Sequence, residues 1–227
     1  MEHFFDSREE ASLAAANRIV AALTRRLDSQ PEASLVVTGG SSPALCYSTL
    51  ADTDIAWSRV HVLLSDERWV PPTHVDSNEK LVREELLIRH AAAADLLPLY
   101  DEQISVSERS SMLNEALEDL TVPMACSLLG MGEDGHFASL FPDADNLELG
   151  MEVDSATYFI PVNTVASPHP RISLTLAALS RSDEIVLLFF GDSKREVYEQ
   201  AKGSSTALPV SKLLFQNRAP VHVFWAP

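Results

Sequence analysis

Residues 124–142 read MACSLLGMGEDGHFASLFP, and this stretch combines a strand signal with the residues that bear most on function. It begins with a short apolar run, which is typical of a buried strand, and glycines follow where that run ends. Gly130, Gly132 and Gly135 spell G-x-G-x-x-G, the pattern of a dinucleotide-binding loop. The stretch therefore raises two alternatives: a nicotinamide site, or a loop that performs acid–base chemistry on another substrate.

Three features of the stretch disfavour a dinucleotide. Glu133 and Asp134 would place like charge against a pyrophosphate, and Pro142 leaves no room for a long phosphate-capping helix. The pattern also lies in the middle of the chain rather than in a first strand–helix–strand unit. In favour of a dinucleotide, Glu152 and Asp154 lie near the spacing of about 20 residues that is expected for a ribose-binding acid.

The segment Asp134-Gly135-His136 suits general-base chemistry better. A carboxylate beside an imidazole orients the ring and raises its basicity. A lone histidine is usually structural, and this chain has seven, but His136 differs because it follows a strand and lies between a glycine and apolar residues close to an acid. His169, which is near Arg171, is the alternative candidate for the base.

Strand-like apolar runs alternate with helical patterns along the rest of the chain. Strands are expected at residues 2–6, 34–40, 59–68, 95–100, 124–132, 157–162, 184–191 and 221–227. Helices are expected at residues 7–27, 43–52, 78–90, 107–120, 171–179, 193–202 and 210–217. The alternation predicts an α/β fold: a doubly wound, mostly parallel sheet with helices on both faces, in a single domain of residues 1–227.

Composition and charge limit the classes of function. The net charge of −16 should repel nucleic acid and anionic membranes, so neither is expected as a partner. No apolar run approaches the roughly 20 residues that cross a bilayer, and acids stand where a secretory signal would be basic and apolar. We therefore expect a cytoplasmic protein, and a monomer, because no segment looks dedicated to assembly.

Cysteine and histidine spacing gives no sign of a metal or a covalent mechanism. Cys46 and Cys126 lie in separate apolar segments and are expected to be buried free thiols. The histidines form no H-E-x-x-H or comparable metal pattern, and no G-x-S-x-G nucleophile motif is present. We therefore expect no metal, no cofactor and no covalent intermediate.

In parallel sheets, ligands bind beyond the carboxyl ends of the strands, so the residues there carry the most information. Residues 38–43 read TGGSSP, which suits an anion cradle at a helix N-terminus, although an ordinary strand–helix turn is the alternative. The candidate cradle residues are Gly39, Gly40, Ser41 and Ser42, ahead of Pro43.

Charged residues at other strand ends add to this candidate site. Arg171, expected at the start of a helix, and Lys194 could supply cations for the same anion, although either could be ordinary surface charge. Asp66 and Glu67 are adjacent in an expected strand and should point in opposite directions. One can therefore enter a site while the other makes a structural contact, such as a helix cap.

Five segments in order resemble the 6-phosphogluconolactonase family, which belongs to a wider group that includes glucosamine-6-phosphate deaminase. They are GGSSP, SDERWVP with DSN at residues 76–78, GMGEDGHFASLFP, PRISLT and GDSK, and they run from Gly39 to Lys194. The first loop of the family commonly reads Gly-Gly-Ser-Thr-Pro; Ser42 stands here in place of threonine and keeps the hydroxyl.

The resemblance implies cytoplasmic hydrolysis of 6-phospho-D-glucono-1,5-lactone to 6-phospho-D-gluconate, in the oxidative pentose phosphate pathway. It implies that His136 is the catalytic histidine with Asp134 as its neighbour. Arg171 and Lys194 would bind the phosphate, and Arg68 would contact the substrate or its phosphate. The implied fold is a doubly wound α/β sheet that works without a metal or cofactor.

Two rival functions remain at this point. Glucosamine-6-phosphate deaminases typically follow the histidine with a run that ends Asn-Glu-Pro, whereas no acid lies between Phe137 and Phe141 here. A non-catalytic sugar-phosphate sensor would keep the cradle and the cations but would not need the pair formed by Asp134 and His136.

Overall fold

The computed structural model describes residues 1–117, 123–203 and 208–227. Within these residues, a seven-stranded sheet has the order β1-β10-β9-β6-β2-β3-β5, and each neighbouring pair is parallel. Its strands are β1 (Glu2–Phe4), β2 (Ala33–Val37), β3 (Val60–Leu64), β5 (Asp95–Leu97), β6 (Cys126–Leu129), β9 (Ile185–Phe190) and β10 (Val221–Ala226). The predicted doubly wound parallel sheet is confirmed.

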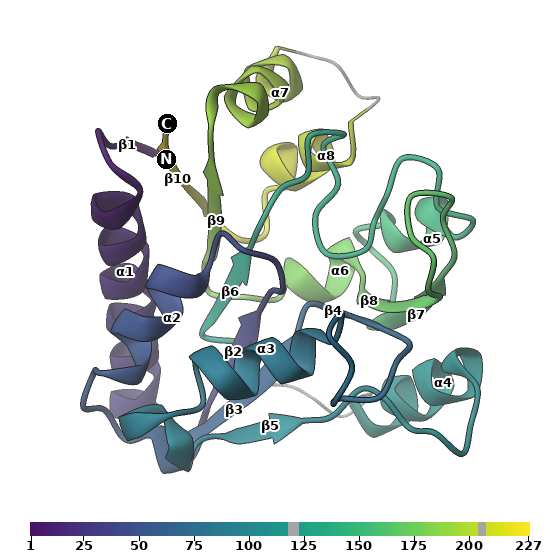
Figure 1. The fold of residues 1–227 in the computed structure, drawn as a ribbon, viewed down its shortest axis with the longest axis horizontal. Coiled ribbons are helices and arrows are strands. Elements are labelled where there is room, and N and C mark those ends of the chain that lie inside the picture. Colours follow the sequence, from purple (N-terminus) through teal and green to yellow (C-terminus); the bar gives the residue numbers. More distant parts are fainter. Residues whose placement is uncertain (118–122, 204–207) are drawn as a thin grey trace.

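Helices cover both faces of this sheet (Figure 1). They are α1 (Arg8–Ser29), α2 (Ala44–Ala51), α3 (Asn78–Glu85), α4 (Val106–Leu117), α5 (Leu147–Gly150), α6 (Leu176–Leu179), α7 (Asp192–Lys202) and α8 (Pro209–Phe215). Two short 3-10 turns, η1 (Trp57–Arg59) and η2 (Arg89–Ala93), precede β3 and β5. In Figure 1, α1 and α2 lie to the left of the sheet, whereas α6 and α8 lie to its right.

The first helix shows how local sequence fixes these elements. Ser7 caps α1 by accepting the backbone N–H of Glu10 at 3.2 Å, as its position predicts. The buried side of α1 carries Ala11, Ala15, Ile19 and residues at the same helical spacing, and this side packs on β9 and β10. Small alanines at these positions let the helix lie close to the sheet.

A second, three-stranded antiparallel sheet was not predicted. It has the order β4-β8-β7, formed by β4 (Asp66–Arg68), β8 (Arg171–Leu174) and β7 (Phe159–Val162). The expected single strand at 59–68 is in fact two strands in different sheets, which separate at Ser65. Ser65 donates its N–H to Val37 in the large sheet and accepts the N–H of Leu174 in the small one.

The expected helix at 171–179 is also wrong. Its first half is β8, and only the single turn α6 follows, capped by the side chain of Thr175. Arg171 therefore lies on a buried strand and not at a helix N-terminus. For the expected helix at 107–120, α4 ends at Leu117, and residues 118–120 lie outside the described residues.

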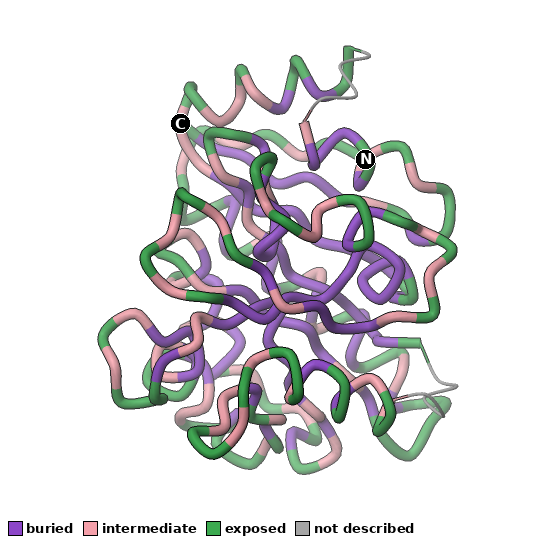
Figure 2. Tube along the Cα trace, turned by 90° about the vertical axis from the view of Figure 1, so that its right-hand side faces the viewer, coloured by how far each residue is buried: buried purple, intermediate pink, exposed green. Residues whose placement is uncertain are grey.

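Buried segments gather at the centre of the molecule, around the strands (Figure 2). Cys46 on α2 and Cys126 on β6 are both buried free thiols within this core, as predicted. Burial raises the pKa of Cys46 to about 12 and also raises the pKa of Cys126 well above its ordinary value. Neither thiol is therefore ionised, or reactive, near neutral pH.

Candidate active site

One hollow of about 380 Å³ lies at the carboxyl ends of the large sheet. This volume suits a small ligand. The strand order runs β2-β3-β5 in one direction and β6-β9-β10 in the other, so the winding reverses between β2 and β6. The hollow lies where such a reversal leaves a crevice between the loops that follow the two strands.

All but one of the predicted site residues line this hollow. The described lining residues are Thr38, Gly39, Gly40, Ser41, Ser42, Asp66, Arg68, Asn78, Gly130, Met131, Gly132, His136, Ala138, Phe141, Ala166, Arg171 and Lys194. Asp134 is the exception, since it lies behind His136 and contacts that ring. Positions far apart in the chain thus meet in one place, as the rule about carboxyl ends predicts.

The glycine loop after β2 forms one wall of the hollow. Tyr47 of α2 fixes the start of the loop, because its hydroxyl accepts the N–H of Thr38 at 3.0 Å and donates to the carbonyl of the same residue. A Cβ at Gly39 would lie 1.9 Å from Oδ1 of Asn78, so only glycine fits there. The loop leads directly into α2, whose first turn has no side-chain cap.

His136 and Asp134 form a close pair in the loop after β6. Nδ1 of His136 lies 2.5 Å from Oδ1 of Asp134, and the same carboxylate oxygen accepts the backbone N–H of His136 at 3.2 Å. A Cβ at Gly132 would lie 2.3 Å from the imidazole ring of His136, so the ring can occupy this position only because residue 132 is glycine. The ring of Phe141 packs against His136 with centroids 4.0 Å apart.

The charge state of Asp134 follows from these contacts. Partial burial raises the pKa of Asp134, but the hydrogen bonds and the charge of His136 outweigh this and lower it overall. Asp134 is therefore ionised at neutral pH. Because its carboxylate accepts from Nδ1, the proton of a neutral imidazole resides on Nδ1 and leaves the lone pair on Nε2.

Asp66 and Glu67 take opposite roles, as their adjacent positions on β4 predict. Asp66 faces the hollow, and its carboxylate accepts the hydroxyls of Ser65 and Ser139 at 2.7 and 2.6 Å. Glu67 faces away and accepts the backbone N–H groups of Asn78 and Glu79, at 2.8 and 2.7 Å, at the start of α3. Ser77 is the N-cap residue of α3, and Glu67 supplements it by accepting these two first-turn N–H groups.

The environment of Glu67 affects its ionisation. Burial raises its pKa, and the hydrogen bonds from the backbone of Asn78, Glu79 and Arg68 and from Ser77 oppose that shift without cancelling it.

Arg171 reaches the hollow from β8 and is held from several sides. Its Nη1 lies 3.4 Å from Oδ2 of Asp66 and 3.1 Å from Oγ of Ser139, and its guanidinium lies over the ring of Phe141. Its Nε is buried and has no partner among the described residues. Burial lowers the pKa of Arg171, and the charge of Asp66 opposes that shift. The group stays charged and keeps a donor for a ligand.

Arg68 and Lys194 complete the cationic side of the hollow. Arg68 donates from Nη1 to the carbonyl of Asp76 at 2.5 Å, and its buried Nε has no partner among the described residues. Lys194 lies in the first turn of α7 and makes no ion pair within the described residues. Burial lowers the pKa of Lys194, while Glu133 and Asp134 oppose the shift.

Sequence reasoning missed some residues of this site. Ser139 links Asp66 to Arg171, although it lies within the stretch quoted first. Asn78 anchors the backbone of Asp66 through its amide, at 2.8 Å, while its side chain packs against Gly39. The alternative base His169 lies outside the hollow lining and contacts Asp76 instead. The roles of Ser139 and Asn78 leave no periodic pattern in the sequence, because each role depends on contacts between segments that are distant along the chain.

None of the helices in the described ranges combines the length and apolar character that a bilayer crossing needs.

Comparisons with known proteins identify a family for the chain and similar folds. The model of the glucosamine-6-phosphate isomerase/6-phosphogluconolactonase family matches residues 6–225. A 6-phosphogluconolactonase of Caulobacter vibrioides is 42% identical over 224 residues, which cover 98% of this chain and 95% of that protein. One of Mesorhizobium japonicum is 37% identical over 223 residues, covering 98% of this chain and 94% of the other.

Among solved structures, a 6-phosphogluconolactonase of Shewanella baltica has a TM-score of 0.93 at 35% identity. The match covers 100% of this chain and 97% of that one.

Proposed function

The chain belongs to the glucosamine-6-phosphate isomerase/6-phosphogluconolactonase family, and on this premise we propose that it hydrolyses 6-phospho-D-glucono-1,5-lactone to 6-phospho-D-gluconate. It is an enzyme of the lactone-hydrolase type that its relatives represent. The reaction belongs to the oxidative pentose phosphate pathway.

One observation carries the mechanism: the imidazole of His136, bonded to Asp134 through Nδ1, faces the same hollow as three cationic side chains. A phosphorylated lactone needs both features, a base for water and cations for its phosphate. The hollow is large enough for a single sugar phosphate.

We propose that His136 acts as general base. Nε2 takes a proton from water as the water oxygen forms a bond to C1 of the lactone. Asp134 holds the ring and stabilises the imidazolium. When the bond between C1 and the ring oxygen breaks, the imidazolium returns the proton to that oxygen, so no proton is left unaccounted for. The carboxylic acid product then ionises in water.

Cations and backbone N–H groups bind the phosphate in this proposal. Lys194 and Arg171, with the loop at residues 39–43, surround the end of the hollow where the dianion is held. Asp66 and Ser139 keep the guanidinium of Arg171 in place through contacts of 3.4 and 3.1 Å. Binding the phosphate in this way brings C1 into register with His136, and such positioning lowers the barrier.

Negative charge on the carbonyl oxygen needs donors as water attacks. Arg68, or N–H groups of the loops that line the hollow, supply them in the proposed mechanism. Arg68 suits this role because its backbone is fixed in β4 and one guanidinium nitrogen is already held by the carbonyl of Asp76.

The first experiment measures lactone decay. The lactone is generated in situ from glucose 6-phosphate and its dehydrogenase, and its loss is followed with and without this protein, because the lactone also hydrolyses spontaneously. Decay well above that background supports the proposal. Decay at background rate contradicts it; ammonia release from glucosamine 6-phosphate would then indicate a deaminase, and binding of a sugar phosphate without turnover would indicate a sensor.

We further propose that residues 1–227 act as one lactonase domain, that the protein is a monomer and that it works in the cytoplasm. Sedimentation at several concentrations tests the monomer, since a self-associating chain would sediment faster as concentration rises.

A further inference from the structure

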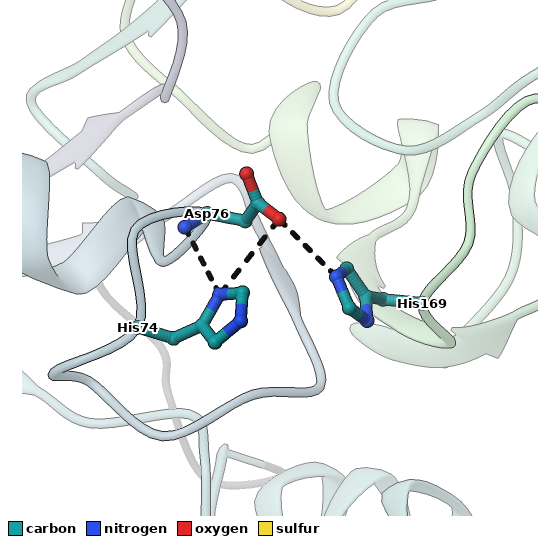
Figure 3. Close-up of side chains that lie close together, drawn as sticks. All are labelled: His74, Asp76 and His169. Carbon is teal, nitrogen blue, oxygen red and sulfur yellow. Dashed lines mark hydrogen bonds and ion pairs between the residues drawn. The ribbon is translucent and has the colours of Figure 1, made fainter.

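Three potential metal ligands meet beside the hollow although the chain separates them widely. His74 and Asp76 lie in the loop between β4 and α3, and His169 lies in the loop before β8 (Figure 3). Nε2 of His169 is 3.2 Å from Oδ2 of Asp76, and Nδ1 of His74 is 3.7 Å from the same oxygen. One ligand atom from each residue lies within 4.8 Å of the other two.

The donor set suits a transition metal. Two imidazoles and one carboxylate form a common protein ligand set for Zn²⁺, with bonds of about 2.0–2.2 Å. Ligand atoms around such an ion lie roughly 3–3.5 Å apart by that geometry. The separations of 3.2 and 3.7 Å to Asp76 are close to this range, and the two imidazole nitrogens, within 4.8 Å of each other, would move closer together on binding. The side chains are 40%, 48% and 28% exposed, which leaves a coordination position open to water.

Backbone contacts outside the cluster hold two of the three ligands, Asp76 and His169, in place. The carbonyl of Asp76 accepts from Arg68, and the carbonyl of His169 accepts the hydroxyl of Ser167 at 3.1 Å. The N–H of Trp69 donates to the carbonyl of Pro170 at 2.8 Å, which ties the two loops together next to the cluster. Supporting contacts of this kind orient metal ligands before the ion binds.

Binding would replace two existing hydrogen bonds, one of which joins Nε2 of His169 to Oδ2 of Asp76 at 3.2 Å. Nδ1 of His74 accepts the backbone N–H of Asp76 at 3.1 Å, and an ion would take that lone pair. The net charge of −16 favours a divalent cation over the whole surface and offsets part of this cost.

We propose that His74, Asp76 and His169 form a binding site for a divalent late first-row transition metal, for which Zn²⁺ is the probe. The ion ties together two loops that border the hollow, because Ala166 shares a loop with His169 and Asn78 follows Asp76. The site is independent of the proposed lactonase chemistry, so either proposal can fail alone.

A second histidine offers a matched contrast. His61 also contacts two carboxylates, but Glu32 lies 3.2 Å from Nε2 and Asp95 lies 3.4 Å from Nδ1. These acids lie on opposite sides of the ring, so one ion cannot reach all three groups. Convergence of ligand atoms, and not the mere presence of histidine and acids, distinguishes the proposed site.

Zn²⁺ binding is measured by equilibrium dialysis, and Co²⁺ binding by its visible absorption. Both use protein with His136→Ala, which removes the imidazole of the Asp134–His136 pair as a competing ligand. We expect one ion per chain, with intense Co²⁺ bands typical of low coordination number. Adding His169→Ala should lower the affinity by at least about tenfold, whereas adding His61→Ala should leave it unchanged.

Two further measurements test whether a variant loses metal binding because it unfolds, and whether the ion binds at these two loops. Asp76→Asn keeps the backbone carbonyl that Arg68 needs, so it should weaken metal binding without unfolding the chain, as circular dichroism will show. Zn²⁺ should also slow amide exchange at residues 71–77 and 163–170, and only when His169 is present. Absence of stoichiometric binding, or binding that His169→Ala and Asp76→Asn leave unchanged, would overturn the proposal.

Discussion

Two hollows of nearly equal size lie at opposite ends of the same parallel strands. The one at the carboxyl ends measures about 380 Å³ and the one at the amino ends about 370 Å³. The described lining of the second includes Glu32, His61 and Asp95 but no lysine or arginine. The two hollows therefore have a similar volume, and each has a histidine beside acidic residues.

The two hollows differ in the residues that surround the histidine. At the carboxyl ends, loops after β2 and β6 bring glycines, a helix start and cations around His136. At the amino ends, His61 lies on β3 between two acids, 43% exposed, with apolar leucines as neighbours. The direction of the strands therefore selects the site, because only one end of a parallel sheet presents the N-termini of the following helices.

Removing each histidine in turn tests the difference between the two ends of the sheet most strongly. His136→Ala should lower kcat by about 10²–10⁴ with little change in KM, which is the usual contribution of a general base. His61→Ala, the matched control, should leave kcat unchanged. Steady-state lactone decay measures both. Full activity in His136→Ala, or an equal loss in His61→Ala, would remove the distinction between the two ends.

The next comparison concerns two lysines of one helix, α7. Lys194→Ala should raise KM by about 10- to 100-fold, since hydrogen bonds to charged groups are worth roughly 1.5–3 kcal/mol. Lys202→Ala should leave KM unchanged, because Lys202 faces Glu2 and Glu199 at the surface. If KM stays the same in Lys194→Ala, then Lys194 does not bind the phosphate.

The smallest expected effect is a pH dependence of product binding. Burial lowers the pKa of Lys194 below its ordinary value of 10.5, against the opposing charges of Glu133 and Asp134. Lys194 must be protonated to hold phosphate, so affinity is complete below the lowered pKa and is lost as pH rises through it. Calorimetry with 6-phosphogluconate, which is stable in base, follows this loss.

Lys194→Arg is the control for this pH dependence, because guanidinium keeps its charge to higher pH. The decline in affinity should move to higher pH in this variant. If the affinity declines at the same pH in this variant, then a group other than Lys194 causes the decline.

The parallel sheet and the main site residues could be predicted because their signals are local. Continuous apolar runs mark buried strands, and polar residues just after them mark the ligand edge. His136, Lys194 and the loop at 39–43 all follow such runs, so their meeting in one hollow needed no knowledge of tertiary contacts.

The small antiparallel sheet could not be predicted by the same reasoning. The run at 59–68 shows no turn signal at Ser65, where the chain passes from one sheet to the other, and only contacts with Val37 and Leu174 reveal the break. The error at 171–179 had a signal: Ile172, Leu174 and Leu176 alternate with polar residues, a period of two that favours a strand. Leucine and alanine at residues 176–179, which favour a helix, mask that signal.

The two buried thiols have a practical consequence for kinetics. With Cys46 and Cys126 fully enclosed and their pKa values raised, a thiol-specific reagent can reach them only when the core opens. Cys46 lies on α2, which follows the glycine loop, and Cys126 lies on β6. Their labelling rates in native buffer therefore report how fast the core opens at the helix and at the sheet. Equal rates would show that helix and sheet open as one cooperative unit, and faster labelling of Cys46 would show that the loop-bearing helix detaches first.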